Sequence, residues 1–148
     1  MKPQTLDATG IAARVPHSGS MCLLQRLRVW SATSIECSAS SHRDLANPLR
    51  TQGQLLATNG IEYAAQAMAL HGSLNAEAGT PPTPGFLASV RAVTLHVPRL
   101  DDVAGELRIV ANKLAGDSRQ ALYSFALHDA HGLLLVDGRA TVILSALP

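Results

Sequence analysis

Hydrophobic and polar residues recur along the chain with two different periods, and the changes of period predict where strands and helices lie. Residues 21–30 and 33–42 are both typical of strands. In the second stretch, apolar Ile35, Cys37 and Ala39 alternate with polar neighbours, as in a half-buried strand. The two stretches together predict a hairpin. Further along the chain, strand patterns bounded by turn residues recur at 86–97, 106–114, 121–128 and 133–144.

Between these two groups of strands, residues 54–72 have the spacing of an amphipathic helix. Ile61, Ala64, Ala65 and Met68 follow the i, i+3, i+4, i+7 pattern, and we expect this face to be buried against the sheet. The surrounding Ala-rich run has high helix propensity, and its small side chains allow close packing.

The order of these elements predicts the fold class. Residues 43–53 and 79–85 contain Asp, Asn, Pro and Gly in the pattern of loops. No helix-length pattern separates the last four strands, so we expect a largely antiparallel sheet. The order β-β-α-β-β-β-β predicts an α+β protein in which a curved sheet wraps one long helix. With 148 residues, we expect a single domain over residues 1–148.

Composition excludes several classes of function. The 12 Lys and Arg balance 11 Asp and Glu, and the few aromatic residues, 3% of the chain, offer no base-stacking platform, so we expect no nucleic-acid partner. No apolar run is long enough to span a membrane, and no signal-peptide pattern opens the chain. Cys22 and Cys37 form no CxxC motif and are expected to be free thiols. A cytoplasmic protein is the expectation.

The motif inventory leaves acid–base chemistry as the remaining class of reaction. The sequence has no HxxxH, no HExxH and no Cys pair at ligand spacing, so we expect no metal. It also lacks GxGxxG, a Walker loop and GxSxG, so we expect no nucleotide cofactor and no ordinary serine hydrolase.

Glu62 is the first candidate for acid–base work, because it stands in an otherwise apolar helical run. Burial would raise the pKa of a carboxyl there towards the range of a general acid, although a helix-surface position is the alternative. Gln66 shares its helix face and could hydrogen-bond to it. Among the histidines, His17 and His42 stand at strand ends or loops, where catalytic groups gather on a rigid scaffold.

Three stretches of the sequence resemble a known family. Residues 15–27 (VPHSGSMCLLQRL) are similar to the opening of bacterial 3-hydroxyacyl-[acyl carrier protein] dehydratases. Residues 60–72 (GIEYAAQAMALHG) resemble their central helix, and residues 85–97 (GFLASVRAVTLHV) the strand after it. Together with NPLR and RLDD, these stretches most resemble the dehydratase-like proteins of aryl polyene clusters.

The resemblance implies the hot-dog fold, a dimer with active sites between two protomers, and a catalytic pair of one histidine and one helix carboxylate. The carboxylate corresponds to Glu62. At the family's histidine position this chain has Pro48, so the nearest candidate is His42, with His17 in reserve. Gln25 also replaces an Asp of the family. A weaker similarity, to the Asp-x-Asn-Pro-x-His loop of hot-dog hydratases, has Arg50 in place of the histidine.

The resemblance implies a dehydratase that removes water from a 3-hydroxyacyl thioester on acyl carrier protein, giving the trans-2-enoyl product. His42 would take the α-proton and Glu62 would protonate the leaving hydroxyl. Asn47, Gln66, His17 and the backbone at Gly53 or Gly60 would bind the substrate. The alternatives are a non-catalytic or half-catalytic subunit of a heterodimer with another hot-dog subunit, and a hot-dog thioesterase or hydratase. Acyl length and the choice between carrier protein and coenzyme A stay open.

Overall fold

The computed structural model describes residues 2–15, 21–76 and 85–144. The elements in chain order are β1 (Leu6–Asp7), α1 (Ala8–Ala12), β2 (Arg26–Trp30), β3 (Ser34–Ala39), the 3-10 turns η2 (Ser41–Arg43) and η3 (Ala57–Asn59), α2 (Gly60–Asn75), β4 (Gly85–Leu95), β5 (Leu107–Gly116), β6 (Gln120–His128) and β7 (Leu134–Leu144). All the predicted strands and the long helix are present. The short elements β1 and α1 were not predicted.

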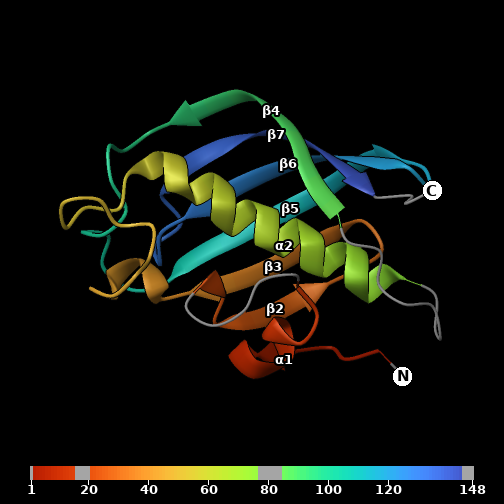
Figure 1. The fold of residues 1–148 in the computed structure, drawn as a ribbon, viewed down its shortest axis with the longest axis horizontal. Coiled ribbons are helices and arrows are strands. Elements are labelled where there is room, and N and C mark those ends of the chain that lie inside the picture. The colour runs from red at the N-terminus through yellow and green to blue at the C-terminus, as the bar shows by residue number, and fades with distance from the viewer. Residues whose placement is uncertain (1, 16–20, 77–84, 145–148) are drawn as a thin grey trace.

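The seven strands form one antiparallel sheet in the order β1-β2-β3-β5-β6-β7-β4. Figure 1 shows α2 lying across one face of this sheet, which curves around it. On β6, for example, Ala121, Tyr123, Phe125 and Leu127 are buried while the residues between them are half-buried. The alternation places the core between the sheet and α2, as the α+β prediction required.

The buried surface of α2 is wider than predicted and is rotated around the helix. Ala64 and Met68 are buried as expected, but Ile61 and Ala65 are only half-buried. Because the curved sheet covers more than one stripe of the helix, residues on both sides of that stripe are buried as well. They are Gly60, Tyr63, Gln66, Ala67, Leu70, His71 and Leu74.

The helix begins at Gly60 rather than at Gln54, because the backbone just before it is bonded to another segment. Leu55 N donates to Asp101 Oδ1 (2.9 Å), and Leu55 O accepts from Leu100 N (2.8 Å). Ala57 N donates to Pro98 O (3.1 Å). These groups are therefore not available for helical bonds. The RLDD motif thus fixes the chain immediately ahead of α2.

Gly60 packs closely against side chains of the sheet. A Cβ at this position would lie 3.1 Å from Leu127 Cδ2 and 3.3 Å from Val136 Cγ2. The first turn of α2 is therefore pressed against β6 and β7.

The two sheet edges differ. β1 is only two residues long and is followed directly by α1, whereas β4 has eleven residues. Leu87, Val90 and Leu95 on β4 are large apolar side chains exposed to solvent. No helix within the described ranges is long and apolar enough to cross a membrane.

Candidate functional site

Glu62 lies in the first turn of α2 and is half-buried. A carboxylate in this position is stabilised by the positive end of the helix dipole. Its neighbours Ile61 and Ala65 are also half-buried, so this part of the helix is not fully covered by the sheet. Glu62 therefore lies on the accessible side of a largely buried helix, where a carboxyl could reach a bound molecule.

Tyr63, the next residue, is fully buried. Its hydroxyl lies 2.8 Å from Ser41 Oγ and accepts from Asn47 Nδ2 at 3.1 Å. Ser41 Oγ in turn donates to Leu23 O at 2.6 Å, so Tyr63 must donate its single proton to Ser41. The bonds thus form one directed chain from Asn47 through Tyr63 and Ser41 to Leu23.

His42 lies in the 3-10 turn η2 and is completely buried. Its Nε2 donates to Val103 O at 3.0 Å, because a carbonyl can only accept. Nδ1 therefore carries the lone pair, and it has no hydrogen-bond partner within the described part of the chain. Burial, with Arg43 and Arg50 nearby, lowers the pKa of His42 below its ordinary value. The ring is thus a neutral base of fixed tautomer, and the structure shows no hydrogen bond from it to Glu62.

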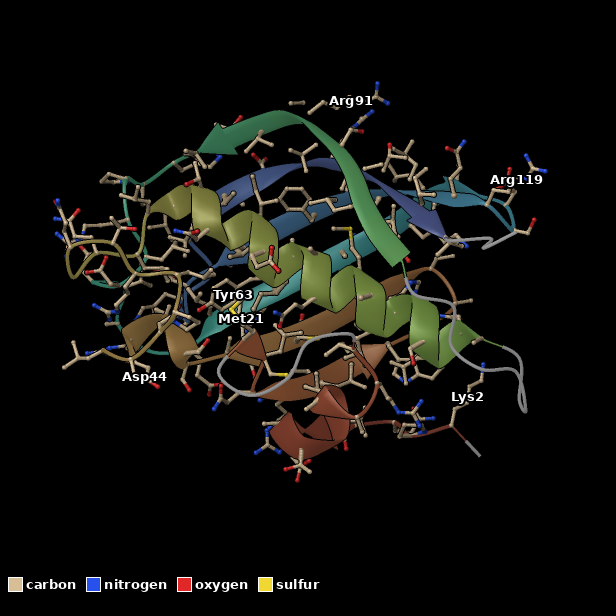
Figure 2. All side chains as sticks on the ribbon, in the orientation of Figure 1. Lys2, Met21, Asp44, Tyr63, Arg91 and Arg119 are labelled. Atoms are coloured by element: carbon tan, nitrogen blue, oxygen red, sulfur yellow. The ribbon has the colours of Figure 1, made fainter. Side chains whose placement is uncertain are left out.

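Gln66 is buried on α2, and its side chain forms hydrogen bonds with the backbone of another segment. Its Oε1 accepts from Leu23 N at 2.9 Å, and its Nε2 donates to Met21 O. Figure 2 labels Met21, whose carbonyl accepts this bond, and Tyr63, which lies on the same helix as Gln66. Gln66 therefore holds the segment that precedes β2, and its contact with substrate stays a prediction.

The other predicted substrate-binding residues lie in different surroundings. Asn47 is buried, and both ends of its amide are hydrogen-bonded. Its Nδ2 donates to Ser41 O (2.8 Å) and to the Tyr63 hydroxyl, and its Oδ1 accepts from Leu49 N (2.9 Å). Gly53 sits in an exposed turn with φ of +76°, and its carbonyl accepts from Arg50 Nη1 at 2.8 Å. His17 lies outside the described residues.

Comparison with known proteins decides the family. A sequence model of the ApeP-like family, described as ApeP dehydratase, matches residues 9–146. The chain belongs to this family. Membership agrees with the resemblance of the loop, helix and strand motifs, and with a fold in which one sheet wraps one helix. No curated protein sequence matches the chain.

Solved structures similar to this member of the ApeP-like family confirm the hot-dog fold. The dehydratase heterocomplex ApeI:P from Xenorhabdus doucetiae matches with a TM-score of 0.77 at 25% identity, over 95% of this chain and 91% of that chain. A thioesterase from Haemophilus influenzae matches with a TM-score of 0.67 at 15% identity, over 96% and 92%. A mutant thioesterase from Pseudomonas aeruginosa gives the same score and identity over 96% of both chains. The two thioesterases show the fold alone.

Sequence reasoning about this chain missed Ser41 and Tyr63. The available signal was the hydroxyl of Tyr63, which lies within the most apolar stretch of the helix. A tyrosine hydroxyl needs a hydrogen-bond partner when it is buried. No group of three or more His, Cys, Asp or Glu residues that could hold a metal occurs among residues the structure describes.

His71, towards the end of α2, gives a pH prediction. It is buried; Nε2 donates to Ser31 O (2.9 Å), and Nδ1 lies 2.7 Å from Tyr123 Oη, which donates to it when the ring is neutral. Burial lowers its pKa, as it does for His42. Below the unfolded pKa of about 6.5, the unfolded chain binds more protons than the folded one. The free energy of unfolding should therefore be greatest above this pH and fall as the pH decreases through the window down to the lowered folded pKa.

Urea unfolding followed by circular dichroism at pH 7.5 and pH 5 checks this prediction. His71→Gln should reduce the pH dependence, while His131→Gln, at an exposed position, should leave it unchanged. Equal free energies of unfolding at the two pH values would contradict it.

Proposed function

We propose that this chain removes water from a 3-hydroxyacyl thioester carried on acyl carrier protein and releases the trans-2-enoyl thioester. The observation that carries the proposal is the half-buried carboxyl of Glu62 in the first turn of α2, in a chain of the ApeP-like dehydratase family. An acid in this place can protonate the leaving hydroxyl of a molecule bound on the uncovered side of α2.

The reaction needs a base and an acid that act on neighbouring carbons. We propose that His42 Nδ1, the lone-pair nitrogen, takes the proton on the carbon next to the thioester carbonyl. The electron pair released there forms the new double bond as the bond to the 3-hydroxyl breaks. Glu62 in its acid form gives its proton to that hydroxyl, which leaves as water. Backbone N–H groups near the start of α2 would stabilise the enolate oxygen. Exchange with solvent returns both groups to their starting protonation states.

The burial of His42 sets a condition on this proposal. In the single chain no part of its ring reaches the surface, so a bound acyl chain must displace part of its cover. The same observation favours a second candidate, in which the chain is a subunit of a hot-dog heterodimer and the base comes from its partner. The similar ApeI:P structure, itself a dehydratase heterocomplex, supports this candidate.

We also propose that two hot-dog subunits pair, either as a homodimer or as a heterodimer. The support is strand β4, whose described side chains are almost all exposed, large apolar ones among them. Exposed strand edges of this kind offer unpaired backbone groups to another chain.

Turnover by the purified chain tests the proposal. The chain alone is given a 3-hydroxyacyl group on acyl carrier protein or on coenzyme A, and the enoyl product and any free thiol are measured. Enoyl product from the chain alone supports the dehydratase. Product that appears only after a second hot-dog subunit is added supports the heterodimer. Release of free thiol without enoyl product, as from a thioesterase, contradicts both.

A further inference from the structure

We propose that Tyr63 is a positioning residue for the dehydration, holding the segment that carries His42 in a fixed place relative to the helix turn that carries Glu62. The inference rests on the proposed function and adds a residue to it. Tyr63 follows Glu62 on α2, and its hydroxyl bonds to Ser41, the residue before His42. The candidate acid and the candidate base are thus each one residue from the two ends of a single 2.8 Å hydrogen bond.

The same group of bonds also holds the segment that follows His17 in the chain. Leu23 N donates to Gln66 Oε1, and Leu23 O accepts from Ser41 Oγ. Both polar groups of this residue's backbone are therefore bonded to side chains rather than to a strand partner. Since Ser41 Oγ is held by Tyr63, the hydroxyl of Tyr63 contributes to the placement of both Leu23 and the segment that begins at Ser41.

The segment from Ser41 to Arg50 depends on such bonds because it contains no strand. It consists of turns, and its anchors include the bonds from Asn47 Nδ2 to Ser41 O and to the Tyr63 hydroxyl. Removing the hydroxyl would leave one proton of Asn47 Nδ2 without an acceptor and Ser41 Oγ without its donor. A buried polar group left unpaired is costly, so the segment should shift until it finds new partners. Misplacement of catalytic groups by about 1 Å can lower a rate by 100-fold.

The chain contains a matched control in its other tyrosine. Tyr123 is also buried, 3% exposed against 0% for Tyr63, and its hydroxyl also makes a hydrogen bond, to His71 Nδ1. His71 lies near the opposite end of α2 from Glu62. Replacing either tyrosine by Phe removes one buried, bonded hydroxyl and nothing else. Only Tyr63 connects to the segments with the candidate catalytic residues.

The first experiment compares Tyr63→Phe with Tyr123→Phe in turnover of a 3-hydroxyacyl thioester, with folding of both checked by circular dichroism. We expect Tyr63→Phe to lower kcat about 10- to 100-fold with little change in KM. Tyr123→Phe should keep kcat within about twofold even if it unfolds at a lower temperature. Equal effects of the two variants on kcat, or an effect of Tyr63→Phe on KM alone, would overturn the inference.

A second measurement does not need turnover, so it separates this inference from the proposed function. The imidazole signals of His42 are followed by NMR through a pH titration in the wild type and both variants. A changed titration midpoint in Tyr63→Phe but not in Tyr123→Phe supports the connection from α2 to His42, even if the wild type proves inactive. An unchanged His42 midpoint in Tyr63→Phe would show that the hydroxyl does not fix this segment, and would overturn the inference.

Discussion

Replacing Glu62 by Gln should lower kcat for dehydration about 100- to 10,000-fold, the usual effect of losing one general acid or base. Glutamine has nearly the same size and can still accept a hydrogen bond, but its amide has no acidic proton to give to the leaving hydroxyl. Since Glu62 is only half-buried, the variant should fold like the wild type. The measurement is the rate of enoyl product formation at saturating substrate, with folding checked by circular dichroism.

Glu106→Gln is the matched control, because it makes the same chemical change at an exposed position just before β5. This control should retain wild-type turnover. A folded Glu62→Gln variant with full activity would remove Glu62 from the mechanism, and with it the observation on which the proposed function depends.

Replacing His42 by Gln should cause a loss of the same order, about 100- to 10,000-fold in kcat. Glutamine is preferred to alanine because its side-chain N–H can still donate to Val103 O, which His42 Nε2 holds at 3.0 Å. The variant therefore keeps a donor for this buried carbonyl and removes the Nδ1 lone pair. An amide cannot accept the α-proton at ordinary pH, so catalysis should fail while the fold persists.

His17→Gln is the comparison for this prediction, and we expect it to have the smaller effect. If His17→Gln loses activity while His42→Gln keeps it, the base is His17 and the assignment of His42 is wrong. If both variants keep their activity while Glu62→Gln loses it, the base comes from a partner chain, as in the heterodimer candidate.

The element types could be predicted from periodicity, but several bounds could not. The alternation at Ile35, Cys37 and Ala39 and the Ala-rich run of the helix are local signals, and both elements are present as predicted. The start of α2 depends on bonds between Leu55 and the segment around Leu100, which are far apart in the sequence. Local propensity contains no information on such contacts.

In the candidate site, too, the residues could be predicted from local patterns, but their long-range contacts could not. Glu62 could be found because an acid within an apolar run is conspicuous, and His42 because a histidine ends a strand pattern. The environment of His42 could not be predicted, since it is set by Val103, 61 positions away. The bonds of the Tyr63 hydroxyl join residues 22 and 16 positions apart, so only the folded chain reveals them.

The unequal edges of the sheet limit how far this chain can assemble. Growth by strand addition needs an exposed edge with several free backbone groups on each new unit. Within the described residues, the eleven-residue β4 offers such an edge, whereas the opposite edge ends in the two-residue β1 with α1 immediately after it. Once β4 is covered by another β4-like strand, neither outer end of the joined sheet can accept a further chain. Under the pairing proposed above, a molecule with one exposed edge strand and one very short edge strand would form closed pairs and would not extend into fibres.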